Sequence, residues 1–123
     1  MKRDMDLVRT ILLKVEADPK FDGTMQPASA VKLGIEGHSE GEVAYNSAQL
    51  VEAGFLTGNT KMATQGLVMV GKLTWEGHEF LDTVRDPDIW RKTKDRAKTV
   101  TTVGLGFLWE IAKAEIKTKL GLP

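Results

Sequence analysis

One helix is marked at both of its ends in this sequence, and it constrains the fold more than any other segment. Ser39 and Glu42 have the spacing of a capping box, in which each side chain accepts a hydrogen bond from a backbone N–H at a helix start. Gly54 stands where a helix commonly ends in the left-handed conformation. We therefore predict a helix over residues 39–53. Its inward face, chosen by helical spacing, consists of Val43, Ser47 and Leu50.

The charge of this segment is one-sided. Residues 33–60 contain no Lys or Arg, and their charged residues are Glu36, Glu40, Glu42 and Glu52. A DNA-binding protein gains much of its affinity by placing Lys and Arg against phosphates. The segment therefore lacks the charge that a DNA-reading helix usually carries.

Other segments also predict regular structure. Val8, Ile11, Leu12 and Val15 lie on one stripe of a helix over residues 4–16, which Asp18-Pro19 ends. Alternating apolar residues predict a short strand over residues 31–35. Residues 57–66 predict a hairpin tip, and residues 67–73 predict the returning strand. Two capped helices follow, one over residues 75–84 with Thr74 as its cap and a basic one that begins at Ile89-Trp90 with Asp88 as its cap. A β-branched segment of flexible character over residues 99–103 leads to a last helix over residues 105–120.

Composition excludes several classes of protein. The 123 residues include no cysteine, so disulfides, a thiolate nucleophile and a cysteine-ligated zinc are excluded. The 17 basic and 17 acidic residues balance, which argues against a general nucleic-acid binder. The longest uncharged run near the C-terminus, residues 99–109, is far shorter than the roughly 20 apolar residues of a membrane span. With no visible signal peptide, we expect a soluble cytoplasmic protein.

The order helix, short strand, helix, hairpin, helix resembles a winged helix, an α+β fold. Four segments together are similar to the small bacterial and prophage family catalogued as domain of unknown function 2513, and these are residues 1–9, 35–39, 52–56, and 73–82 followed by Ile89-Trp90. The resemblance covers roughly residues 1–17, 35–56 and 71–92. It implies a winged-helix fold and a frequent association with phage or mobile DNA. It implies no established activity, so no residue role is carried over.

DNA binding is one functional hypothesis. The predicted outward residues of the third helix are Ser39, Glu40, Ala44, Tyr45, Ala48 and Gln49. Of these, Gln49 could read adenine, and Ser39 or Tyr45 could contact phosphate. Lys61 at the hairpin tip could add a phosphate contact, as could the basic run that consists of Arg91, Lys92, Lys94, Arg96 and Lys98. Alternatively, the helix is structural with an acidic first turn that complements its dipole, and the lysines are solvated.

Protein interaction is the other hypothesis, through the acidic third helix or the last helix. The last helix has an apolar side that could pack on the domain, bind a partner or pair with a second copy. A location on a membrane surface would need more cations on its polar side. We favour a homodimer by a small margin. Its candidate interface consists of Leu105, Leu108, Trp109, Ile111, Ala112 and Ile116.

Catalysis and metal binding are not expected. His38 and His78 could meet Glu36 or Glu79 at a metal, but they lack the spacing of a histidine metal motif. No glycine-rich phosphate loop or nucleophile elbow is present. We therefore predict a non-enzymatic protein without cofactor. Its domains would be a winged helix over residues 1–98 and a C-terminal amphipathic helix over residues 99–123.

Overall fold

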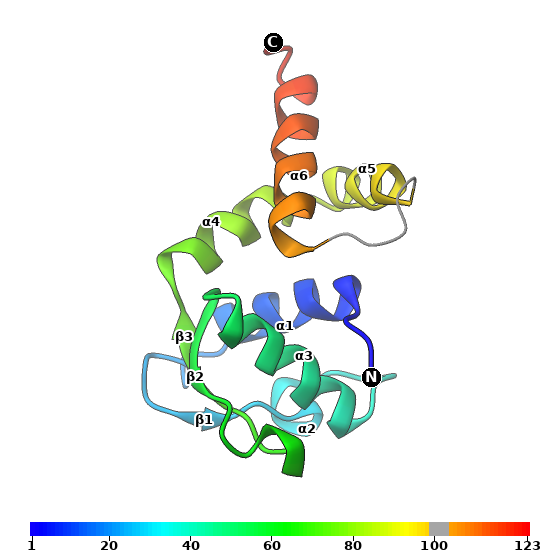
Figure 1. The fold of residues 1–123 in the computed structure, drawn as a ribbon. Coiled ribbons are helices and arrows are strands. Elements are labelled where there is room, and N and C mark those ends of the chain that lie inside the picture. Colours follow the sequence, from blue (N-terminus) through cyan, green and yellow to red (C-terminus); the bar gives the residue numbers. More distant parts are fainter. Residues whose placement is uncertain (99–103) are drawn as a thin grey trace. The chain divides into compact units, whose positions relative to one another are not determined.

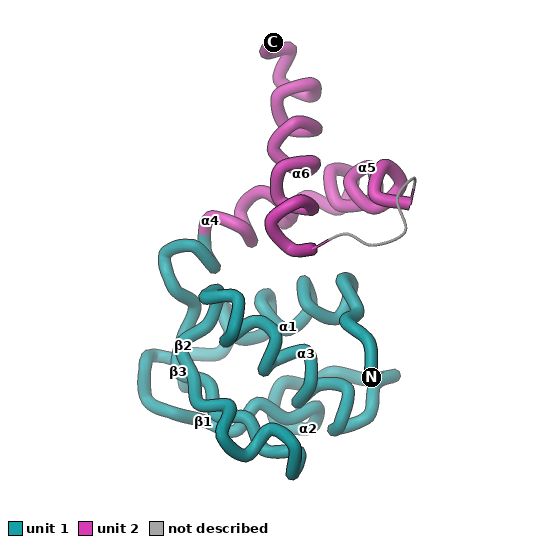
Figure 2. The backbone as a smooth tube through the Cα atoms, viewed as in Figure 1, with its two compact units in different colours: residues 1–78 teal, residues 79–123 magenta. Residues whose placement is uncertain are grey.

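The computed structural model describes residues 1–98 and 104–123. Its contacts divide the chain into two compact units, unit 1 over Met1–His78 and unit 2 over Glu79–Pro123 (Figure 2). The segment predicted to be of flexible character, residues 99–103, lies outside the described residues. The division of the chain into a domain over residues 1–98 and a helix beyond it stays a prediction.

The described residues form a mixed α+β protein with six α-helices and a three-stranded antiparallel sheet (Figure 1). The elements that begin in unit 1 are α1 (Met5–Ala17), β1 (Gln26–Pro27), α2 (Ala30–Leu33), α3 (Glu40–Glu52), β2 (Leu56–Asn59), the 3₁₀ turn η1 (Ala63–Gln65), β3 (Met69–Leu73) and α4 (Trp75–Val84). Helix α4 continues into unit 2, which adds α5 (Pro87–Ala97) and α6 (Leu105–Lys119). The α+β fold class is thus confirmed.

Strand β3 is the middle strand of the sheet, between β1 and β2. The β2–β3 pairing contains a bulge between Leu56 and Gly58. A side chain at Gly58 would collide with the backbone oxygen of Met69 and would lie 2.7 Å from Val51 of α3. Glycine therefore lets the hairpin approach both its own partner strand and α3.

Helices α1 and α3 confirm their sequence patterns. The α1 stripe is fully buried, and Asp18 caps the end of the helix. In α3 both hydrogen bonds of the capping box form between Ser39 and Glu42, at 3.1 Å each. The predicted inward residues of α3 are 0% exposed, and these are Val43, Ser47 and Leu50. Helical periodicity therefore located the core side of unit 1 correctly.

The strand predicted over residues 31–35 is wrong, because this segment forms α2 and its C-cap. Ser29 accepts a hydrogen bond from the Lys32 N–H at 3.1 Å, and Gly34 ends the helix with a φ of 69°. Val31, Leu33 and Ile35 alternate in the sequence but do not share one buried face. Leu33 and Ile35 are buried, whereas Val31 is 84% exposed. The cap residues Ser29 and Gly34 mark this segment as a helix. They are more informative here than the alternation of apolar residues, which predicted a strand.

The predicted cap of the basic helix is also wrong by two residues. Asp86, rather than Asp88, accepts from the N–H groups of Asp88 and Ile89, at 2.8 and 3.3 Å. Pro87 occupies the first turn of α5, where its missing N–H costs no helical hydrogen bond. Pro87 therefore starts α5, directly after the cap residue Asp86.

Unit 2 is built on an aromatic pair and buried apolar residues. Phe80 and Trp109 pack edge to face with ring centroids 5.9 Å apart. Ile89 and Trp90, in the first turns of α5, are buried. At the other end of α4, Trp75 lies in the first turn and is 77% exposed.

Candidate nucleic-acid interface

A groove runs along the outward face of α3 and has a volume of about 390 Å³. It is lined by residues of α3, of the β2–β3 loop that contains η1, and of the N-terminus, and these are Met1, Gly41, Tyr45, Ala48, Gln49, Glu52, Ala63, Thr64 and Gly66. The floor is therefore formed by α3 and one wall by the loop of the β2–β3 hairpin. Two of the three predicted polar candidates of the helix, Tyr45 and Gln49, lie in it half-buried, whereas Ser39 does not line it.

The exposed strip of α3 is narrower than helical spacing predicted. Ser39 and Glu40 are exposed, as expected, but Ala44 and Ala48 are only 2% and 5% exposed. The prediction that Ala44 points outward was wrong, whereas Ala48 lines the groove but offers little surface; α2 and η1 both contact α3. The part of α3 that a ligand can reach is thus centred on Tyr45 and Gln49.

The two acidic residues in the first turn of α3 are engaged within unit 1. The Glu40 carboxylate accepts a hydrogen bond from the Ala30 N–H at the start of α2. The Glu42 carboxylate accepts from the Ser39 N–H and lies 3.2 Å from Nδ1 of His38. The Ser39 N–H, helped by His38, holds the pKa of Glu42 below its usual value. These carboxylates stabilise the α2–α3 corner.

Residues 1–3, called the N-terminal arm below, lie against α3. The Asp4 N–H donates to Oδ1 of Asn46 at 2.8 Å, and Nδ2 of Asn46 donates to the Glu42 carbonyl at 2.9 Å. Asn46 is 1% exposed, so both of its hydrogen bonds are shielded from water. Sequence reasoning missed this arm, for which the one available signal was a polar Asn46 beside the inward stripe of α3.

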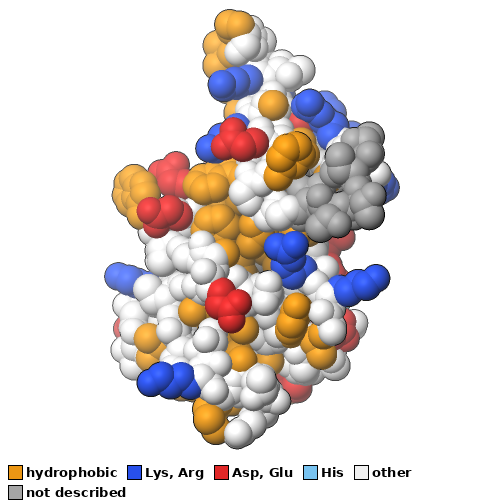
Figure 3. Space-filling model, in the orientation of Figure 1, with side chains coloured by type: hydrophobic (Ala, Val, Ile, Leu, Met, Phe, Trp, Pro, Cys, Tyr) orange, Lys and Arg blue, Asp and Glu red, His pale blue; other side chains and the backbone are white. Residues whose placement is uncertain are grey.

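The loop between β2 and β3 carries Lys61, which is exposed. Its N–H donates to Oδ1 of Asn59 at 2.9 Å, which orders the turn after β2. Lys2, Arg3 and Lys61 make no ion pair with any residue in the ranges 1–98 and 104–123. Figure 3 shows Lys and Arg scattered over the visible face of unit 1 rather than gathered in one patch. On this face of unit 1 the cations therefore lie apart from one another.

The basic run lies on α5, in unit 2, and its members have neighbours there. Arg91 and Lys92 both pair with Asp88, at 2.7 and 3.3 Å. Lys98 pairs with Asp95 at 3.5 Å, and Arg96 pairs with Glu115 of α6 at 2.9 Å. Lys94 lies over the Trp90 ring, 5.8 Å from its centroid. The run thus has less net charge than its sequence suggests, because Asp88, Asp95 and Glu115 face it.

The candidate dimer residues of α6 divide into two groups. Leu105, Leu108 and Ala112 are already buried within the chain, and Trp109, Ile111 and Ile116 are half-buried. A groove of about 440 Å³ next to Ile116 is closed at one side by the Lys119–Asp86 ion pair, whose Nζ–Oδ2 distance is 3.0 Å. The homodimer stays a prediction, and Trp109, Ile111 and Ile116 are the members of the set with surface still to bury.

The two histidines do not share a site. His38 neighbours Glu42, whereas Nδ1 of His78 lies 3.9 Å from Glu16 of α1. Over the described parts of the chain, no three His, Asp or Glu residues are grouped so that they could hold a metal ion. In the same residues, no helix has the length and apolar character that crossing a bilayer requires.

Comparison with known proteins supports the family resemblance that the four sequence segments indicated. A protein of Haemophilus influenzae that carries the name "Uncharacterized protein" is 32% identical over 122 residues, which cover 98% of this chain and 99% of the relative. No solved structure matches the chain. The family model described as "Hypothetical protein (DUF2513)" matches residues 2–104. The chain therefore belongs to the DUF2513 family.

Proposed function

We propose that unit 1 is a winged-helix domain that binds double-stranded DNA, in a regulator of phage or mobile-element genes. The observation that carries the proposal is the arrangement of its elements. The chain order is α1, β1, α2, α3, β2, β3, the sheet order is β1–β3–β2, and the β2–β3 loop borders the outward face of α3. A helix beside a hairpin wing is a common way to present side chains to a DNA groove. The link to phage genes rests on the family resemblance alone.

The exposed strip of α3 supplies the reading side chains in this proposal. The Gln49 amide can donate to and accept from an adenine edge, which is the usual geometry for Gln. The hydroxyls of Tyr45 and Ser39 would contact the sugar–phosphate backbone, and Lys61 would do so from the wing. The cations of α5 contribute less, because acidic residues of unit 2 already face them.

The acidity of α3 is compatible with this role. Glu40 and Glu42 are held in hydrogen bonds at the α2–α3 corner. Only Glu52 is an acidic residue of the groove itself. The proposed role is non-enzymatic and requires no cofactor.

Fluorescence anisotropy with the full chain and labelled mixed-sequence DNA duplexes, at low salt and then in a salt titration, tests the proposal. We expect micromolar binding that weakens as salt rises, because phosphate contacts release counterions. Absence of binding at micromolar protein and low salt would reject the DNA-binding role.

A second candidate function, a protein-interaction module, is favoured by a specific observation. Trp75 and Val31 are 77% and 84% exposed, and large exposed tryptophans are frequent anchors of protein interfaces. Glu36 and Glu40, which line one pocket together with Val31, would suit a basic partner. A photo-crosslinking residue at position 75, with one at Lys14 as control, should capture one specific protein from a bacterial extract. Equal capture at both positions would reject this function.

A further inference from the structure

We propose that the N-terminal arm supplies the phosphate-binding cations that α3 lacks, and that Asn46 is the positioning residue that holds the arm across the helix. This inference rests on the proposed DNA-binding function and adds Lys2 and Arg3 to its contact residues. Its ligand is the sugar–phosphate backbone of a DNA duplex.

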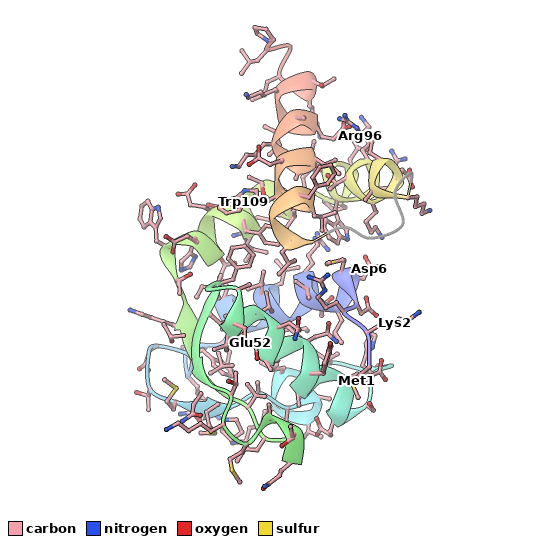
Figure 4. All side chains as sticks on the ribbon, viewed as in Figure 1. Met1, Lys2, Asp6, Glu52, Arg96 and Trp109 are labelled. Carbon is pink, nitrogen blue, oxygen red and sulfur yellow. The ribbon has the colours of Figure 1, made fainter. Side chains whose placement is uncertain are left out.

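The arm is attached to α3 at two points. At one point, the Asp4 N–H donates to the buried amide of Asn46. At the other, Met1 lines the groove, and a Cβ at Gly41 would lie 3.5 Å from Cε of Met1. Figure 4 shows Met1 near the first half of α3 and Glu52 toward the other end of that helix. The arm is therefore docked on the helix, with Lys2 and Arg3 between the two points of attachment.

The position of these two points shows which side of α3 the arm crosses. Gly41 and Asn46 are five residues apart, which places them about 140° apart around a helix of 3.6 residues per turn. The inward face between them, at Val43 and Ser47, is completely buried. A chain that connects the two points therefore passes over the outward face, above the N-terminal half of α3.

This path carries positive charge to the acidic helix. Lys2 and Arg3 are exposed and make no ion pair within residues 1–98 and 104–123. Lys61 lies two residues before η1, whose Ala63 and Thr64 line the same groove. The two segments that border α3 in this groove, the arm and the hairpin loop, thus each carry cations that could contact phosphates. The charge complementarity favours DNA over an acidic protein, because the groove floor carries the polar Tyr45 and Gln49 and only one carboxylate.

The proposed role of Asn46 predicts what its replacement would do. Replacing its amide removes the acceptor of the Asp4 N–H and releases the arm, while every cation remains in the chain. A merely structural residue would change the stability of unit 1 but not the salt dependence of DNA binding by the folded protein. A positioning residue changes both.

The test compares full-chain variants in the salt titration described above. The variant K2Q/R3Q removes both arm cations, and K14Q/K20Q removes two exposed cations near the far end of α1 and so matches its net charge. Each phosphate contact contributes about 0.9 to the slope of log K against log salt, so K2Q/R3Q should reduce that slope by about two units. N46A should reduce it at a temperature where the protein is folded by circular dichroism. K14Q/K20Q should keep the slope of the unmodified protein.

Four outcomes overturn the inference, and they are distinguishable. If the unmodified chain binds no DNA, the proposed function fails and the inference fails with it. If the unmodified chain binds and K2Q/R3Q keeps its slope, DNA binding stands and the arm is excluded from it. An equal loss in K2Q/R3Q and K14Q/K20Q shows a general effect of net charge, which also rejects the arm. Tighter binding by K2Q/R3Q or N46A would make the arm an inhibitor and would overturn the proposal.

Discussion

Helix α3 of unit 1 and helix α5 of unit 2 differ in how their charges are used. Helix α3 has no cation, yet two of its carboxylates are engaged in local hydrogen bonds, and the basic N-terminal arm lies against it. Helix α5 has five basic residues in or next to it, yet Asp88, Asp95 and Glu115 face four of them. The number of cations along a segment therefore does not measure the charge that it offers to a ligand.

The comparison also shows two ways of fixing a helix. The start of α3 is held by polar contacts, from Ser39, Glu42 and Asn46. Helix α5 is held by apolar burial of Ile89 and Trp90, and exposed ion pairs lie on its outer face. Because exposed ion pairs contribute little to stability, the two helices should respond differently to mutation and to pH.

The largest effect is expected in the core of unit 2. Phe80 is 0% exposed, so Phe80→Ala should lower the free energy of unfolding by about 3–5 kcal/mol. Urea denaturation followed by tryptophan fluorescence measures the change. Phe107→Ala, at a side chain that is 58% exposed, is the control and should change stability by less than about 0.5 kcal/mol. Similar losses in both variants would mean that unit 2 has no core at Phe80.

Asn46→Ala tests whether the start of unit 1 depends on polar contacts. The substitution leaves the Asp4 N–H and the Glu42 carbonyl without their Asn46 partner, and it should cost about 1–3 kcal/mol of unfolding free energy. Gln49→Ala on the reachable face of α3 is the control and should cost much less. A cost for Asn46→Ala no larger than that of the control would remove the distinction between the two helices.

Ser39→Ala probes the capping box of α3. Loss of the side-chain acceptor for the Glu42 N–H should cost about 1 kcal/mol. Ser39→Thr keeps the hydroxyl and should restore most of the stability in the same thermal denaturation. If threonine restores nothing, the hydroxyl is not the stabilising group and the capping account of α3 is wrong.

The smallest effect is expected from the ion pairs at the start of α5. Lys119 holds the pKa of Asp86 below its ordinary value, and Arg91 with Lys92 does the same for Asp88. A lowered carboxylate pKa contributes stability above the unfolded-state value of about 3.9, and this is lost as pH falls through the folded-state value. The pKa of Lys119 is raised by Asp86, so its contribution is complete below its ordinary value and is lost at strongly alkaline pH.

Lys119→Gln should therefore flatten the acid limb of a plot of Tm against pH below about pH 4, while Lys117→Gln on the same helix should leave it unchanged. An unchanged acid limb in Lys119→Gln would show that this ion pair contributes nothing measurable, as many exposed pairs do.

Much of the architecture could be predicted because its signals are local. The stripe of α1, the capping box of α3 and Gly54 each act within one or two turns, and each was read correctly. The segment at residues 31–35 was misread because Leu33 and Ile35 fit a period of two as well as a single helical turn. The arm was missed because its partner Asn46 is 42 residues away from Asp4, and no local pattern connects them. The pairing of the α5 cations with Glu115 of α6 was hidden for the same reason.

The most direct test of the account compares the two helices by equal charge removal. K2Q/R3Q takes two cations from the arm on α3, and K92Q/K98Q takes two paired cations from α5. In salt titrations of DNA binding, the account predicts a loss of about two slope units for the arm variant and less than about half a unit for the α5 variant. A large loss in K92Q/K98Q with no loss in K2Q/R3Q would contradict it and would move the DNA contact to unit 2.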